Sequence, residues 1–171
     1  MALLENGQPI ADPWTFVADG ADLPAAGDVI VTLARLNAGV EPPAGGRLGV
    51  RLTSSELAEA AAPHLPRLAL VAVEFPKFRD GRGFSTAREL RERFGFKGEV
   101  RAVGHTLPDQ YRFLLRVGFS TVEVPDGANL ASWQAALTEI AVAYQRAVDD
   151  ATPASLLRRR FAAPPAGERT P

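Results

Sequence analysis

The chain has 171 residues, a formal net charge of −1 and no cysteine, and 46% of its residues are hydrophobic. This length predicts one domain that buries a core without disulfides. The absence of cysteine excludes disulfides, thiol nucleophiles and cysteine-ligated zinc or iron–sulfur sites. Because 19 basic residues balance 20 acidic ones, nucleic acid and anionic membranes are not expected partners.

The sequence shows neither a targeting segment nor a membrane span. Its start lacks the basic flank and apolar run of a signal peptide. The longest apolar stretch, residues 68–73, is far shorter than a membrane helix. We therefore expect a cytoplasmic protein that makes no contact with membranes.

Composition divides the chain into three parts. Residues 1–27 are rich in Pro, Gly, Asp and Ala and predict an irregular N-terminal arm. Residues 28–161 are expected to form a single α/β domain. Residues 162–171 are rich in Pro and predict a disordered tail.

Strand-like and helical segments alternate along the middle of the chain. Apolar and β-branched runs predict strands at 28–36, 48–52, 68–75, 99–103 and 120–124. Capping and stop signals predict helices at 54–62, from Ser85 or Thr86 to Phe94, from Thr106 to Val117, and after Asn129 with Trp133, Leu137, Ile140, Tyr144 and Val148 as its apolar face.

This alternation with short connections is typical of parallel β/α units. About four units fit between residues 47 and 150, too few for a closed eightfold barrel. We therefore expect a small, mostly parallel sheet of four to five strands, which is open or half-barrel-like and in the latter case pairs with a second copy as a homodimer.

Each of the four central strands carries at least one ionisable residue, which is unusual in strands covered on both faces. These residues are Arg51, Glu74, Glu99 with Arg101, and Glu123. One interpretation is that they neutralise one another or lie in water at strand ends. The other places Glu74 and Glu123 at the carboxyl ends of parallel strands, where α/β proteins bind ligands. The candidate catalytic residues are then Glu74 or Glu123 as base and Arg101, which stabilises developing negative charge.

The segment 75–91 leaves a strand, turns and enters a helix, whose start offers free amides and partial positive charge. Its cations and hydroxyl group suit a phosphate, sulfate or carboxylate. The candidate anion-binding residues are Lys77, Arg79, Asp80, Gly81, Arg82, Gly83 and Ser85. Because the segment matches no GxxxxGK[ST] phosphate loop, the alternative is a structural turn anchored by Phe75, Phe78 and Phe84, with its arginines paired to acids.

Three polar residues around the next strand are secondary candidates. His105 has the side chain of a general acid or base, although a lone surface histidine at a helix start is the commoner case. Asp109 and Gln110 lie on the first turn of the helix, where capping explains them. Arg91 is expected on a solvated helix face. With only two histidines in the chain, a multi-histidine metal site is excluded. Carboxylates could still hold magnesium, but nothing singles out such a site, so no metal-binding residues are predicted. No dinucleotide fingerprint identifies a cofactor.

Several segments resemble the bacterial domain-of-unknown-function 934 family. They are FPKFRDGRGFSTARELRERFGFKGEVRAVG (75–104), DQYRFLLRVGF (109–119), AYQ (143–145) and RRRF (158–161), within a match that spans about 68–161. Family genes commonly lie beside those for assimilatory sulfite reductase and sulfate activation. Members often carry an oxidoreductase label on that association rather than on demonstrated chemistry. His105 departs from the acidic or amide residue usual there, which argues against a catalytic role, and the family offers no established catalytic residues.

The resemblance implies an accessory or regulatory protein of sulfite reduction within sulfur assimilation, which binds sulfite reductase, its electron donor or an anionic metabolite. A docking interface would use Phe78, Arg79, Arg82, Tyr111 and Arg112. The alternative is a small enzyme that acts on a phosphorylated or sulfated metabolite held by residues 77–85. A third hypothesis is an oxidoreductase with a nicotinamide or flavin, although the cofactor stays unknown.

Overall fold

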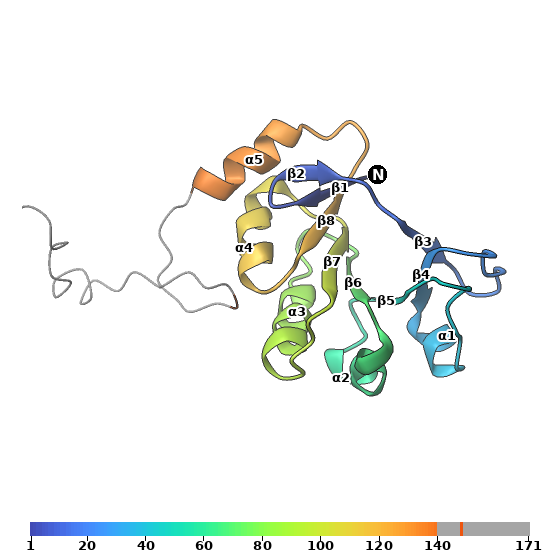
Figure 1. Cartoon of the computed structure of the whole chain (residues 1–171). Helices are drawn as coiled ribbons and strands as arrows, with labels where there is room; N and C mark the ends of the chain where they lie inside the picture. The colour runs from blue at the N-terminus through green and yellow to red at the C-terminus, as the bar shows by residue number, and fades with distance from the viewer. Residues whose placement is uncertain (140–147, 149–171) are drawn as a thin grey trace, which may run out of the picture.

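The computed structural model of the chain describes residues 1–139 and 148, and every structural statement below concerns these residues. They form one eight-stranded sheet with helices on one side (Figure 1). The strands are β1 (Ala2–Glu5), β2 (Gln8–Ile10), β3 (Trp14–Val17), β4 (Asp28–Thr32), β5 (Leu48–Leu52), β6 (Leu70–Phe75), β7 (Glu99–Gly104) and β8 (Thr121–Val124). The helices are α1 (Leu33–Asn37), α2 (Ala58–Ala61), α3 (Arg82–Glu92), α4 (Tyr111–Arg116) and α5 (Leu130–Glu139).

Strands β3 to β8 are parallel and lie side by side in chain order. Right-handed crossovers in a sheet wound in one direction keep the connecting helices on one face, as in a β/α barrel. The expected α/β class and half-barrel-like shape are confirmed (Figure 1). The expected four to five strands are wrong, because the sheet has eight.

The N-terminal segment is not an irregular arm, since it supplies three of the eight strands. β1 and β2 form an antiparallel hairpin, and β1 also pairs antiparallel with β8. The turn residues Asn6 and Gly7 both have positive φ, 48° and 80°, as the tight hairpin turn of an Asn-Gly pair requires. The phenolic oxygen of Tyr111 accepts the Gly7 N–H at 2.7 Å and so ties the hairpin to α4.

β2 and β3 are the two edges of the sheet, yet only residues 11–13 join them. Laid flat, eight strands would extend ~34 Å, whereas this connection reaches at most ~14 Å. The sheet must therefore curl until its edges approach one another. We call residues 11–13 the strap, because they bridge the open side of the concave face.

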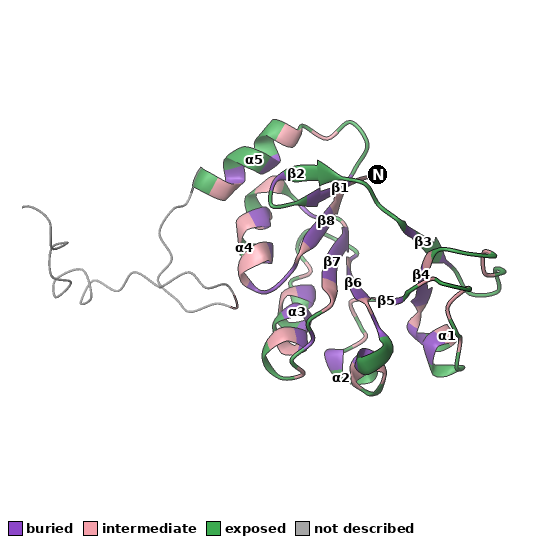
Figure 2. Cartoon of the chain, in the orientation of Figure 1, coloured by how far each residue is buried: buried purple, intermediate pink, exposed green. Residues whose placement is uncertain are grey.

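The main core lies between the sheet and the helices. Alternate strand residues such as Val31, Val50, Val73 and Val100 face the helices and are almost fully buried. Figure 2 shows the central strands largely in the colour of buried residues. The concave face holds a second, smaller cluster, which consists of Trp14, Ile30, Leu70, Ala72 and Val103. Most polar strand residues are therefore left for the concave face.

Several boundaries differ from the expected ones. The predicted strand 28–36 ends at Thr32, whose hydroxyl caps α1 by accepting the Arg35 N–H. The helix expected at 54–62 shortens to Ala58–Ala61, followed by a 3₁₀ segment (Ala62–Arg67). In α5, Trp133 is buried as expected. The other predicted helix residues Ile140 and Tyr144, and the predicted tail at 162–171, lie outside the described residues. No helix in the described part is long and apolar enough to cross a membrane.

Candidate functional site

The strand-borne charges all lie on the concave face. The register pairs Arg51 with Ala72, Ala72 with Arg101 and Arg101 with Thr121, so the four residues form one row across β5 to β8. Glu74, Glu99 and Glu123 each lie two residues from a member of this row and therefore point to the same face. Parallel pairing thus brings together the three candidate catalytic residues.

Arg101 is the centre of this cluster and has no exposed surface. Its Nη1 and Nη2 donate to the two carboxylate oxygens of Asp12 at 2.7 and 3.0 Å. Its Nε donates to Glu99 at 2.9 Å, and the same Glu99 oxygen accepts the Thr121 hydroxyl at 2.6 Å. The Glu123 carboxylate lies 3.6 Å from Nη1. Three carboxylates thus surround one guanidinium.

Burial and neighbouring charges shift the pKa values of this cluster. Burial alone would lower the pKa of Arg101, but hydrogen bonds and charges from Asp12 and Glu99 outweigh it and raise that pKa. Burial raises the pKa of Glu123, and the positive charge of Arg101 only partly opposes this. Glu123 therefore holds a proton more tightly than an ordinary glutamate.

Arg51 and Glu74 form a second pair toward the open edge of the concave face. The guanidinium lies 3.2 Å from the Glu74 carboxylate and 5.0 Å from the ring centre of Phe16. Both charged side chains keep about a quarter of their surface exposed. Every arginine on the concave-facing row is therefore already paired with carboxylates of the chain itself.

The loop before α3 has two parts. In the part that we call the fixed half, from Asp80 onward, side-chain contacts hold the residues in place, whereas residues 76–79, the free half, line a pocket. In the fixed half, Arg82 donates to Asp80 at 2.6 and 2.9 Å and to the Ser54 hydroxyl at 2.9 Å. The Arg82 pair also holds the pKa of Asp80 well below its ordinary value. The helix begins at Arg82 with Gly81 as its cap, so the expected start at Ser85 or Thr86 is wrong.

Gly83 serves packing inside the fold. A Cβ at this position would lie 2.6 Å from Cζ of the buried Phe75 ring, which leaves no room for any side chain. Phe84 adds an edge-on contact with Phe75, with ring centres 5.2 Å apart. Ser85 lies inside α3 and is exposed. For these residues the structural turn fits the geometry better than an anion cradle.

The free half of the loop opens into a pocket, which we call the carboxyl-end pocket. It has a volume of about 360 Å³ and is lined by Pro76, Lys77, Phe78, Arg79 and His105. Its residues follow the neighbouring parallel strands β6 and β7, where open α/β sheets bind ligands. The structure therefore brings together Lys77, Arg79 and His105, three of the residues singled out in the sequence.

The side chains of Lys77 and Arg79 differ from those of nearly all other described cations. Neither side chain forms a hydrogen bond or ion pair with a described residue, and the Arg79 guanidinium only lies over the Phe78 ring, 5.3 Å from its centre. Among the described lysines and arginines, only Lys97 shares this lack of a polar partner. None of the described residues that line the pocket is acidic. Its free positive charge is thus available to an anion.

Gln110 joins the two loops of the carboxyl-end pocket, which sequence reasoning did not anticipate. Its Nε2 donates to the Phe78 carbonyl at 3.0 Å, and its Oε1 accepts the Leu107 N–H at 3.1 Å. Gln110 is therefore a positioning residue for Phe78. Asp109 is exposed beside it, on the first turn of the following helix.

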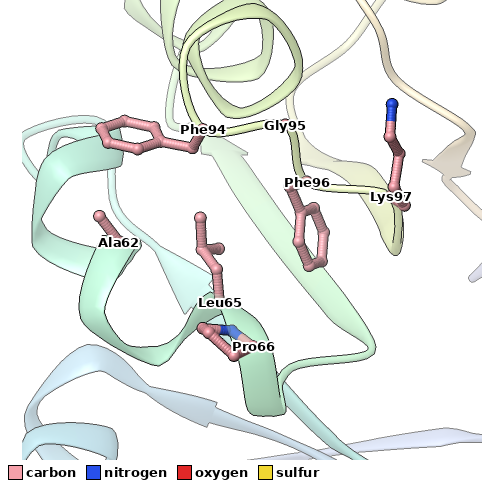
Figure 3. A pocket seen from close by; sticks show the side chains of 7 residues that line it. All are labelled: Ala62, Leu65, Pro66, Phe94, Gly95, Phe96 and Lys97. Carbon is pink, nitrogen blue, oxygen red and sulfur yellow. The ribbon is translucent and has the colours of Figure 1, made fainter.

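A second pocket, the amino-end pocket, lies at the opposite end of β6 and β7. It has a volume of about 280 Å³. Figure 3 shows Leu65 and Pro66 opposite Phe94 and Phe96, with the amino group of Lys97 directed away from them. Apart from Lys97, no charged residue lines this apolar pocket.

Arg91 was expected on a solvated face of α3, and this expectation is wrong. Its guanidinium donates to the carbonyls of Gly118, Phe96 and Gly98 and to the Ser120 hydroxyl, at 2.7–2.9 Å. Burial lowers its pKa. Arg91 therefore fastens α3 to the loops that precede β7 and β8.

No group of three or more His, Asp or Glu side chains within residues 1–139 is arranged to hold a metal ion. Of the acids on the concave face, Asp12, Glu74 and Glu99 already accept hydrogen bonds from arginines. Nothing in this geometry singles out a cofactor.

Comparison with protein-family models gives a match over more than half of the chain. The family model described as a bacterial protein of unknown function, DUF934, matches residues 49–155. This range contains β5 apart from its first residue, all of β6 to β8, the carboxyl-end pocket and Arg101. The search of curated proteins gives no match.

Proposed function

Because the chain belongs to the bacterial DUF934 family, we propose that it is an accessory protein of sulfite reduction that binds an anionic ligand in the carboxyl-end pocket. The observation that carries this proposal is the pair of cations, Lys77 and Arg79, whose side chains have no polar partner in the described part of the chain. The neighbourhood of family genes supports the link to sulfur assimilation.

The pocket suits an anion that also carries apolar surface. Phe78 is 48% exposed and lies between the two cations in the chain, with Pro76 on the same rim. His105 adds a donor, since at least one ring nitrogen carries a proton in either charge state. A free anion would meet three donors, whereas a protein partner would present an acidic side chain beside an aromatic or aliphatic one.

Calorimetric titration with sulfite, sulfate and inorganic phosphate tests the anion site. The purified chain should bind at least one of them, and the double variant Lys77→Ala/Arg79→Ala should weaken that binding by roughly 10-fold or more. The matched control is Arg88→Ala, which removes an exposed cation of α3 that pairs with Glu92. Equal affinity in the double variant and the control would overturn the anion site.

Co-purification with sulfite reductase tests the partner. The wild-type chain should be retained on immobilised reductase, and Phe78→Ala should reduce retention because it removes the exposed ring between the cations. Phe16→Ala is the control, since Phe16 is similarly exposed but belongs to edge strand β3. Absence of a complex with wild type at low and physiological salt would contradict the docking role.

A second candidate is an acid–base enzyme acting on phosphate or sulfate esters. The observation that favours it is Glu123, whose raised pKa is typical of catalytic carboxyls. Fully buried Arg101 offers no open contact to a substrate, so this candidate ranks second. Release of nitrophenol from p-nitrophenyl phosphate or sulfate, lost in Glu123→Gln, would favour the enzyme. The visible spectrum of the purified protein tests for a flavin.

A further inference from the structure

The strap directs one side chain, Asp12, onto the concave face. Asp12 precedes edge strand β3, whereas its partner Arg101 lies on β7, four strands away in the sheet. The two residues are 89 positions apart in the chain. The charge that neutralises Arg101 most directly therefore comes from the connection across the open side, and not from the sheet itself.

The contact between Asp12 and Arg101 has the geometry in which an arginine binds a carboxylate ligand. Each terminal nitrogen donates to a different oxygen of one carboxylate, at 2.7 and 3.0 Å. This two-point contact is how a guanidinium binds a free carboxylate, because the two planar groups match. A carboxylate that is not part of the chain could make the same two hydrogen bonds.

The guanidinium is held in position without Asp12. Its Nε donates to Glu99 at 2.9 Å, and Glu99 is itself fixed by the Thr121 hydroxyl at 2.6 Å. Both partners belong to the sheet, on β7 and β8. If Asp12 moves away, the two terminal nitrogens still point toward the open side.

The strap is also the outer layer at this point. Its residues Ala11, Asp12 and Pro13 are all exposed, whereas Arg101 is fully buried. Apart from the Arg101 contact, the only side-chain hydrogen bond of the strap to a described residue runs from the Trp14 N–H to Asp12, at 3.1 Å. A single side chain therefore attaches the strap to the concave face.

From these contacts we infer that Arg101 is a binding site for a monoanionic carboxylate, which enters by displacing Asp12. The single negative charge of Asp12 indicates that the ligand is a monoanion. A monoanion would leave the net charge around Arg101 unchanged, whereas a dianion would add negative charge beside Glu99 and Glu123. The site lies apart from the carboxyl-end pocket and does not depend on the function proposed there.

Acetate, the smallest stable carboxylate with a methyl group, is the probe. The variant Asp12→Gly should unfold at a lower temperature than wild type, because Arg101 loses its main partner. Sodium acetate should raise that Tm by at least ~3 °C over sodium chloride at equal ionic strength. The control Asp28→Gly removes the carboxylate of another arginine pair, in which Asp28 on β4 contacts Arg47 just before β5, and should show no effect specific to acetate.

A second measurement keeps Asp12 in place. In the variant Trp133→Phe, Trp14 is the only tryptophan left, and its backbone N–H is bound to Asp12. Saturable change of its fluorescence with acetate, absent in Trp133→Phe/Arg101→Lys, would support displacement. No response of Trp14 would overturn the inference even if Asp12→Gly fails to fold. No acetate-specific rise in the Tm of folded Asp12→Gly would overturn it as well.

Discussion

The concave face and the carboxyl-end pocket use the same kinds of residues in opposite ways. On the concave face, Arg51 and Arg101 are paired with acids of the chain, and Arg101 has no exposed surface. In the pocket, Lys77 and Arg79 are exposed and have no polar partner among the described residues. Paired cations shape the fold, whereas unpaired cations are available for a ligand. The difference predicts which substitutions change stability and which change binding.

The largest effect on stability is expected for Arg101→Ala. The substitution leaves the Asp12, Glu99 and Glu123 carboxylates close together without their shared cation. Removal of one partner from a buried ion pair costs about 3–5 kcal/mol in unfolding free energy. Urea denaturation followed by circular dichroism measures it. A loss below ~1 kcal/mol would remove the contrast between the two regions.

Arg91→Ala should have the next largest effect. Arg91 satisfies three carbonyls and one hydroxyl between α3 and the β7 and β8 loops, and its removal leaves these acceptors without their donor. We expect a loss of about 2–3 kcal/mol in unfolding free energy. Arg88→Ala on the same helix is the matched control, because its exposed pair with Glu92 contributes little. Equal losses would contradict the structural role of Arg91.

The variant Glu123→Gln tests the concave face through the pH dependence of stability. Because burial raises the pKa of Glu123, the folded state holds this proton more tightly than the unfolded state. The resulting stabilisation is fully present below the ordinary value of 4.5 and is lost as pH rises through the raised value. Wild type should therefore lose stability relative to Glu123→Gln as pH increases from 4 to 8, measured as the midpoint of urea unfolding.

Asp28→Asn supplies the control of opposite sign. The Arg47 hydrogen bond lowers the pKa of Asp28, so its contribution is present at neutral pH and disappears as pH falls through the lowered value. The Asp28→Asn and wild-type curves should converge at low pH. Parallel curves for Glu123→Gln and wild type would show that Glu123 does not titrate differently in the folded state.

The smallest effect on stability is expected for Lys77→Ala/Arg79→Ala. Both side chains are exposed and make no polar contact with residues that the structure describes, so the unfolding free energy should stay within about 0.5 kcal/mol of wild type per substitution. The same double variant is predicted to lose anion binding. If it unfolds more easily instead, the cations of the pocket belong to the fold as those of the concave face do.

The parallel units could be predicted from the sequence because local signals define them. Apolar runs such as residues 68–75 and the capping residues between them identify β/α units without knowledge of the fold. The Asn6-Gly7 turn was also a visible hairpin signal, but the short flanking strands include Pro9 and are partly exposed. Their stability comes from pairing with β8 and from Tyr111, which local sequence does not reveal.

The division of the candidate site could not be predicted. In the sequence, nothing separates the residues of segment 77–85 that serve packing from those that are available to a ligand. Only the fold brings Ser54 to Arg82 and the Phe75 ring against Gly83. Likewise, the strand charges could be placed on one face by the period of two. That Arg101 is covered by Asp12 depends on the strap, a contact across 89 residues.

The pairing of β1 with β8 has a consequence for synthesis on the ribosome. Residues 2–5 leave the ribosome before the other strands of the sheet, yet their partners at residues 121–124 are the last strand of the sheet to be made. Long-range pairing of this kind slows folding, because the chain between must be ordered first. Strands β3 to β7 can assemble as the chain emerges. Strand β1 can therefore pair only after β8 has been synthesised, and this pairing completes the central part of the sheet.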